Sequence, residues 1–365
     1  MAKFPMTDEH IRRRLFWLLQ RHSSYSLWQC KREAWALFAG KYEEAMKTWP
    51  EEKTEGFDEK AIIWIYDALR LYDEGLSELS VGNRQVWQIK TGEFYQLSRP
   101  IDLVRSFFWA SCHERWIHVE HYPEHVIPLD NLRFAAECYG DNLLFPPYDN
   151  VCNIFEADYL LNSERYNGVF HTYPYPVFPK KLPPVPEGTD IIIKTGEVIP
   201  CDGIWEPVKI QYNHKLLVIK SDISGFKNLG TYNYFIRGMN APLQVYEDLL
   251  LAEGLGYRDV HWRLVWEDTR YCDGIIPDES EYFLNEAQGK RIQCRTGEQC
   301  PHSGQWATLE GGHQQFTYAR AGQKMPEAQV FKGSFGPTAL IPASWSLVDR
   351  DDGGSVFVIS TDEKK

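Results

Sequence analysis

The first half of the chain repeats apolar residues with the period of an amphipathic helix. In two long segments the apolar side chains recur three, four or seven positions apart, which places them on one helical face. They are Trp28, Trp35, Phe38, Tyr42, Met46 and Trp49 in the first segment, and Ile62, Ile65, Leu69, Tyr72, Leu76 and Leu79 in the second. Ser98 and Pro100 predict the start of a third helix that runs to about Tyr122. These patterns predict an all-α domain over residues 1–168.

The pattern changes at a proline-rich segment, residues 169–188. Six prolines between residues 174 and 186 exclude a helix interior and favour an extended chain. We therefore predict a linker here, either a stiff spacer or a coat laid against a domain surface. Beyond it, short β-branched and aromatic runs separated by Gly, Asn and Pro predict strands. One stretch, QVYEDLLLAEGLGY at 244–257, instead predicts a helix, so the fold class is α+β.

Two motifs in the β-rich half share one spacing. KTGEVIPCDGIW at 194–205 and RTGEQCPHSGQW at 295–306 have Thr, Gly, Glu, Pro, Gly and Trp in common at an offset of 101 positions. Two further anchors follow each motif in the same order. They are Tyr-x3-Gly-x3-Pro at 234–242 and 318–326, and Trp-x-Leu-Val at 262–265 and 345–348. Three anchors in one order predict two related β-modules, 189–290 with a helical insert and 291–365.

The shared motif residues are typical of a fold corner rather than of a catalytic site. Thr-Gly-Glu after a strand predicts a tight turn with its Gly at positive φ, and Pro-x-x-Gly predicts a second turn that brings the Trp over the first strand. We assign this structural role to Gly196, Pro200, Gly203, Trp205, Gly297, Pro301, Gly304 and Trp306.

A histidine-rich stretch is the strongest candidate for a metal site. His118, His121 and His125 fall on one helical face, with Cys112 and His113 nearby. Such spacing suits zinc if a further ligand arrives from elsewhere. The alternative is a helix end whose histidines favour the dipole and cap carbonyls. No paired Cys-x-x-Cys completes the set, so we predict no bound metal.

The cysteines of the second motif do not form a site that both modules share. Cys294, Cys300 and His302 are close in sequence, but the first copy has only Cys201 in the corresponding region. A metal that the module needed would have ligands in both copies, so buried or turn-edge thiols are favoured. The chain also lacks the phosphate-loop, dinucleotide and nucleophile-elbow motifs. We predict a protein that is not an enzyme and binds no cofactor.

The charge narrows the classes of partner. The net charge is −12 and the pI is about 5.5, which disfavours nucleic acid and favours a basic protein partner. No segment is apolar and long enough for a membrane span, and the N-terminal segment does not resemble a secretion signal. Eight dispersed cysteines suit a reducing compartment, so we expect a cytoplasmic protein with no membrane partner. The oligomeric state is left open.

The most concentrated charge lies between the two modules. Residues 267–286 hold seven acidic side chains against Arg270 alone. The plainer interpretation is a solvated loop, whereas the functional one is a surface that steers a basic partner and anchors it with apolar side chains. On the functional interpretation the candidate binding residues are Asp273, Ile275, Ile276, Asp278, Glu279, Glu281 and Tyr282.

The order of the motifs resembles a known group of families. A Trp- and Tyr-rich helical domain, then TGExCPxSGxW, Gly-x3-Pro and W-x-L-V, is similar to bacterial polymorphic-toxin immunity proteins, families seventy-one and seventy-two. The most specific segments are 296–306, 322–326 and Trp345. The first copy departs from the pattern, with Ile199 for Cys300 and Asp202 for Ser303.

The resemblance implies an inhibitor that binds a cognate toxin delivered by a contact-dependent system such as type VI secretion. It brings no catalytic residues to transfer, and a cytosolic inhibitor suits a toxin with a basic nuclease-like domain. Two other functions stay open. One is an adaptor or chaperone that loads an effector for secretion; the other is a metal-dependent enzyme built on His118, His121 and His125.

Overall fold

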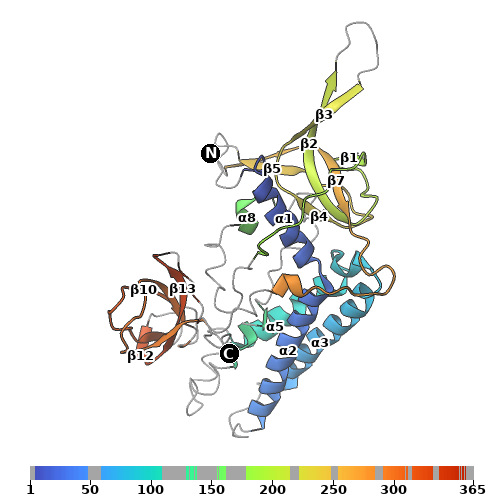
Figure 1. Cartoon of the computed structure of the whole chain (residues 1–365). Helices are drawn as coiled ribbons and strands as arrows, with labels where there is room; N and C mark the ends of the chain where they lie inside the picture. The colour runs from blue at the N-terminus through green and yellow to red at the C-terminus, as the bar shows by residue number, and fades with distance from the viewer. Residues whose placement is uncertain are drawn as a thin grey trace, which may run out of the picture.

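The chain folds into helices in its first part and strands in its second, the α+β class predicted from the sequence. The structure is a computed structural model (Figure 1). It describes residues 5–47, 59–108, 129–130, 132–134, 136–137, 154, 156–161, 178–213, 222–247, 254–283, 291–308, 310, 315–331 and 337–352, with 354, 356 and 358.

The helical part is built on two long helices that lie side by side, α2 and α3 (Figure 1). Side-chain caps begin the first two helices: Asp8 accepts the amide of His10 at 2.8 Å, and Ser24 accepts that of Leu27 at 3.3 Å. The helical elements are α1 (Glu9–His22), α2 (Tyr25–Met46), α3 (Glu59–Leu79), η2 (Arg84–Trp87), α4 (Glu93–Gln96), α5 (Ser98–Phe108) and α8 (Asp158–Leu161).

The predicted aromatic stripe is the core of this part. Trp28, Trp35, Phe38 and Tyr42 are all buried, which confirms the helical period. The third helix starts at Ser98, as predicted. Trp49, the predicted course of that helix past Phe108, and the histidine-rich stretch lie outside the described residues.

The helical core continues into the first sheet. Ile204, Tyr234, Val265 and Tyr282 belong to the same buried cluster as the helix residues. The proline-rich segment adds Phe178, whose ring packs 5.2 Å from that of Trp17. Its described part therefore lies against the helical domain, as the coat interpretation expects.

The first sheet is antiparallel, with strand order β1-β7-β2-β3 and β4 paired to β2. Its strands are β1 (Ile192–Lys194), β2 (Gly203–Asn213), β3 (Asp222–Asn228), β4 (Asn233–Phe235) and β7 (His261–Glu267). A separate hairpin joins β5 (Gln244–Glu247) to β6 (Leu255–Arg258).

That hairpin corrects the two ends of the helix predicted at 244–257; residues 248–253, the middle of that stretch, lie outside the described residues. Val245 pairs with Tyr257 and Glu247 with Leu255, so both described ends of the stretch are strand. Short segments such as these two ends do not by themselves distinguish a helix from a strand, and cross-strand pairing decides their conformation.

The second sheet has strand order β10-β9-β13-β8 and its own core around Trp306 and Trp345. A second ladder pairs β11 with β12. The strands are β8 (Gln293–Arg295), β9 (Gly304–Thr308), β10 (Gln315–Ala319), β11 (Ala328–Phe331), β12 (Pro337–Ile341) and β13 (Ser344–Arg350). One short helix, η5 (Ser280–Phe283), precedes this sheet.

Matched motif positions make matched contacts in the two sheets. Trp262 donates its indole N–H to the carbonyl oxygen of Pro242 at 2.8 Å, and Trp345 does the same to Pro326 at 2.9 Å. The threonine hydroxyls of the two Thr-Gly-Glu turns donate to the same two proline oxygens, at 3.1 and 2.8 Å. The corner is thus held by Thr and Trp side chains of two motifs that meet on a backbone carbonyl oxygen of the third.

The glycines of these corners have the backbone geometry that the turns require. Gly196 and Gly297 lie in the left-handed region, at φ of 86° and 82°. Gly203 lets β2 approach β7 so closely that a Cβ there would lie 2.1 Å from the carbonyl oxygen of Trp266. Behind these turns Trp205 and Trp306 are fully buried.

We expect opposite stability changes from two glycine-to-alanine substitutions. Gly196→Ala places a side chain in a left-handed turn and should lower the free energy of unfolding by about 1 kcal/mol. Gly40→Ala, in the exposed face of α2 with open space around it, should raise that free energy by about 0.5–1 kcal/mol. Denaturant unfolding measures both, and changes of the same sign would contradict the assignment.

Candidate binding surface

The acidic segment between the modules is a strap with a buried anchor and an exposed tip. We define the strap as residues 267–283, from the end of β7 through η5. It leaves the first sheet after β7 and runs along the helical domain to η5 (Figure 1). The two ends of the strap are held by different sets of helical residues.

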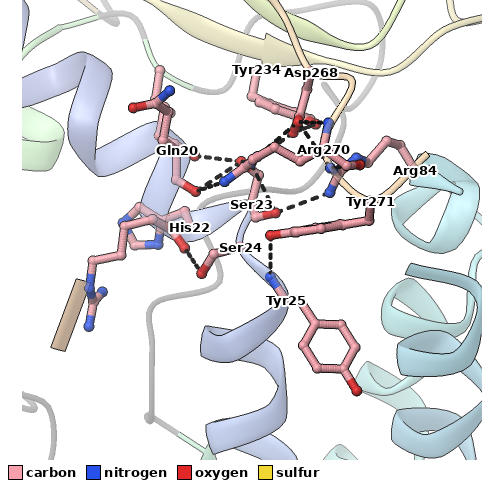
Figure 2. Close-up of polar contacts among 12 residues, drawn as sticks. Gln20, His22, Ser23, Ser24, Tyr25, Arg84, Tyr234, Asp268, Arg270 and Tyr271 are labelled. Carbon is pink, nitrogen blue, oxygen red and sulfur yellow. Dashed lines mark hydrogen bonds and ion pairs between the residues drawn. The ribbon is translucent and has the colours of Figure 1, made fainter. Parts of the chain in front are cut away.

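The anchor is a buried carboxylate, Asp268, that contacts two arginines and a tyrosine (Figure 2). Arg84 donates to its Oδ1 at 3.0 Å, and Arg270 donates to Oδ1 at 2.9 Å and Oδ2 at 2.8 Å. Tyr234 of β4 donates its hydroxyl to Oδ2 at 2.8 Å. Both carboxylate oxygens are therefore fully used inside the protein.

The charges of this cluster compensate for its burial. Burial alone would raise the pKa of Asp268, but Arg270 and Arg84 and the hydrogen bonds from Arg270 and Tyr234 outweigh it and leave that pKa below its ordinary value. Burial would lower the pKa of Arg270, but the negative charge and the hydrogen bonds of Asp268 outweigh burial and raise that pKa above its ordinary value. Both groups are held in their charged forms.

The same arginines satisfy the carbonyl groups at the end of α1. Arg270 donates to the carbonyl oxygen of Gln20 at 3.0 Å and to the hydroxyl of Ser23 at 2.6 Å, and Arg84 donates to the carbonyl oxygen of Ser23 at 3.2 Å (Figure 2). A helix end leaves its last carbonyls without intrahelical partners. The cluster therefore joins the α1–α2 turn to both η2 and the strap.

The far end of the strap caps α2. Glu279 accepts the backbone N–H of Ser26 at 2.8 Å and is hydrogen-bonded to the hydroxyl of Tyr271, which itself accepts the N–H of Tyr25 at 2.9 Å. A carboxylate at a helix N-terminus also favours the helix dipole. The carbonyl oxygen of Tyr282 accepts from Arg21 at 2.8 Å, and the Tyr282 ring packs against Trp17.

These contacts divide the predicted binding residues into two groups. Glu279 and Tyr282 are buried, at 4 % and 7 % exposed, because they hold the strap to the helices. Neither side chain is accessible to a partner. The burial of these two residues therefore argues against the toxin-binding role predicted for them from the sequence. The other five are exposed: Asp273, Ile275, Ile276, Asp278 and Glu281.

The exposed tip presents apolar side chains between acidic ones. Ile275 is 65 % exposed and Ile276 37 % exposed. Turns order the backbone around them, since Asp273 accepts the N–H of Ile275 at 2.9 Å and Asp278 accepts that of Ser280 at 3.0 Å. Within the described ranges, none of the exposed carboxylates of Asp273, Asp278 and Glu281 forms an ion pair.

The thiols of the second module belong to the fold. Cys294 and Cys300 are buried, and burial raises the pKa of both thiols. The thiol of Cys300 donates to the carbonyl oxygen of His302 at 2.9 Å, and Cys201 of the first module is also free. The part of the chain that the structure describes contains no cluster of three possible metal ligands; His118, His121 and His125 lie outside it.

Next to the anchor, the ring of His22 is buried without hydrogen-bond partners among the described residues. It ends α1 and is 1 % exposed, and neither ring nitrogen has a partner in the described structure. Burial, with the charges of Arg21 and Lys31, holds the pKa of His22 well below its usual value. The ring is therefore neutral in the folded protein at pH values where the unfolded chain is protonated.

Sequence reasoning had not identified the anchor. Arg84, Tyr234 and Asp268 are far apart in the chain, and Arg270 had appeared only as the lone base in an acidic run. The one signal was the low number of basic residues there, since a single arginine among seven acids suggests a specific ion pair.

Comparison with known families agrees with the motif resemblance. Residues 184–284 match the family model described as Immunity protein 72. The matched segment comprises the first sheet and the whole strap. The residues that carry the motif resemblance most specifically, 296–306, 322–326 and Trp345, instead lie in the second module. No curated protein and no solved structure matches the chain significantly. Among the described helices none has the length and apolar character of a membrane span.

The anchor makes a prediction about stability. Asp268→Asn keeps the size of the side chain but leaves Arg84 and Arg270 without their buried counter-charge. We expect the free energy of unfolding to fall by about 3 kcal/mol, the usual range for breaking a buried pair on one side. Thermal and urea unfolding measure this loss, for which Asp273→Asn at the exposed tip is the control; equal losses in both variants would contradict the role of the anchor.

His22 makes a prediction about pH. The pKa of His22 is about 6.5 in the unfolded chain and lower in the folded protein. The free energy of unfolding is therefore unaffected by this group above pH 6.5 and falls below that pH, because the unfolded chain takes up a proton that the folded protein does not. Between pH 7 and 5.5 this one group should cost about 1 kcal/mol. His22→Leu should remove that part of the pH dependence, and an unchanged slope in urea titrations would contradict a neutral buried ring.

Proposed function

We propose that this protein is an immunity protein that binds and neutralises a cognate antibacterial toxin, without catalysing a reaction. The observation that carries the proposal is the match of residues 184–284 to an immunity-protein family, which includes the strap. We place the encounter in the cytoplasm, with a toxin delivered by a contact-dependent, type VI-like system.

The exposed tip of the strap has the composition of a protein-binding surface. Its two isoleucines offer apolar contact area, and the exposed carboxylates of Asp273, Asp278 and Glu281 flank them in the sequence. Apolar anchors supply affinity, whereas unpaired charges speed the encounter and select for the opposite sign. The net charge of −12 acts in the same direction, so the toxin domain that fits is basic.

The anchor contributes by holding the tip in place. Asp268 fixes one end of the strap to η2, and Glu279 fixes the other to α2. A loop that is held before binding loses less conformational freedom when a partner docks. The buried half of the strap therefore supports the function of the exposed half without touching the toxin.

The basic test is protection. Co-expression with the toxin encoded by the adjacent gene should restore growth, whereas an adaptor or chaperone would alter export of the toxin without protecting the cell. Failure to protect, together with no binding of the purified toxin domain, would refute the proposal.

The tip is tested by charge reversal. The triple variant Asp273→Lys, Asp278→Lys, Glu281→Lys should lower the association rate by about tenfold or more at low salt and flatten its salt dependence. Stopped-flow or surface plasmon resonance with the toxin domain measures both.

A matched control separates local charge from total charge. Glu33→Lys, Glu247→Lys and Asp259→Lys change the net charge equally at exposed positions of α2, β5 and the turn before β7. They should leave most of the association rate intact. Equal losses in the two triple variants, or no loss in the tip variant, would contradict a binding role for the tip.

A further inference from the structure

The second module contains the same tyrosine–aspartate pair that anchors the first. Tyr234 donates its hydroxyl to Asp268 at 2.8 Å, and Tyr318 donates to Asp351 at 2.6 Å. The tyrosines are 84 positions apart and the aspartates 83, the offsets of the other anchors in the same strands. The backbone hydrogen bonds of the two aspartates also correspond. The N–H of Asp268 donates to the carbonyl oxygen of residue 202 at 2.9 Å, and that of Asp351 donates to the carbonyl oxygen of residue 303 at 3.1 Å.

In the first module, helical residues cover this pair. Tyr234 is 6 % exposed, and the ring of Trp87 packs edge-on against it. Its neighbour along the chain, Tyr232, is fully buried, and the guanidinium of Arg12 lies over that ring, 5.2 Å from its centre. Together with Arg84 on Asp268, these contacts make the buried set of Tyr232, Tyr234 and Asp268 a receptor for arginines and an aromatic ring of the helical domain.

In the second module the corresponding face is open. Tyr318 is 54 % exposed, and Phe316, at the position of Tyr232, is 39 % exposed. Two arginines close in sequence do not hold Asp351 as Arg84 holds Asp268: Arg350 pairs with Asp352, and the exposed Arg320 interacts with the Tyr318 hydroxyl. Among the described residues no arginine or lysine forms an ion pair with Asp351.

We propose that the face formed by Phe316, Tyr318 and Asp351 is a second docking surface for the toxin, and that it receives an arginine of the toxin with an aromatic or apolar neighbour. The occupant is inferred from the first module, where the same pair receives Arg84 and Trp87 of this chain. This inference rests on the proposed function, because it assumes that the partner is the toxin.

The chemistry favours arginine over lysine in the partner. A guanidinium is planar and presents several N–H groups in a fixed arrangement. A single guanidinium can therefore hydrogen-bond to a carboxylate and lie over an aromatic ring at the same time. The tyrosine hydroxyl already holds one oxygen of Asp351, which leaves the other oxygen free to accept. Phe316 adds apolar area beside the charge, as Tyr232 does in the first module.

Matched substitutions in the two modules test the inference. Tyr318→Phe and Asp351→Asn should leave the melting temperature within about 1 °C, because both side chains are exposed. Asp351→Asn should raise the Kd for the toxin domain encoded by the adjacent gene by about tenfold or more, since a charge pair buried in the complex loses one side. Tyr318→Phe removes only the hydroxyl that orients Asp351 and should raise that Kd by about threefold or more. In contrast, Tyr234→Phe and Asp268→Asn should lower the melting temperature by several degrees.

A charge swap identifies the partner residue. Asp351→Arg should bind the toxin domain more weakly still, and one arginine-to-aspartate change in the toxin should restore its binding by about tenfold or more. A scan of the exposed arginines of the toxin against Asp351→Arg in calorimetry finds that residue, and a scan without any restoration would overturn the arginine assignment.

The outcomes distinguish this inference from the proposed function. Wild-type affinity in Tyr318→Phe and Asp351→Asn, with weak binding in the tip variant, overturns the inference and leaves the immunity function standing. No binding and no protection by the unaltered protein overturns the function itself. Self-association of the unaltered chain in sedimentation velocity, lost in Tyr318→Phe, overturns the toxin as occupant and assigns the face to a second copy.

Discussion

A carboxylate buried between two guanidinium groups holds three parts of this protein together. Asp268 lies at the end of the first sheet, Arg84 in η2 of the helical domain, and Arg270 in the strap. A buried charge is costly unless its partners are in place, so these parts hold one mutual arrangement. The helical domain and the first sheet therefore share a core and cannot separate without exposing the cluster.

The same constraint explains why an acidic segment has two different roles. The acids at the two ends of the strap are used internally: Asp268 pairs with arginines and Glu279 caps α2. Because both ends are fixed, the six residues from Asp273 to Asp278 form an exposed turn with an ordered backbone. Charge in this segment thus serves folding at the ends, and its exposed middle is the part that we propose for recognition.

The two sheets show how one module can serve inside and outside a protein. Both have the same corner of Thr, Gly, Pro and Trp and the same tyrosine–aspartate pair. The first sheet uses the pair to bind its own helical domain, whereas the second has it at the surface. The pair that holds arginine and aromatic groups of this chain in the first sheet has, in the second, the chemistry that we propose holds those of the toxin.

Much of the fold followed from sequence because local periodicity and turn chemistry act over short distances. The aromatic stripe of α2, the start of α5 and the left-handed glycines of the corners were all predicted from neighbours in the chain. The helix prediction was wrong at residues 244–247 and 255–257, because a short segment fits a helix and a strand equally well and only pairing with another strand decides.

The candidate site was only partly predictable for a different reason. Composition identified the strap as acidic and interleaved with apolar residues, but composition does not say which side chains face inward. Glu279 is an acid like Glu281, and Tyr282 is a large apolar residue like Ile275. Glu279 and Tyr282 are nevertheless buried, because they contact α1 and α2. The sequence by itself determined the elements, the repeated corner and the excess of negative charge. Only the tertiary structure decided which acids are paired within the protein and which remain free to meet a partner, because that depends on contacts between residues more than 180 positions apart.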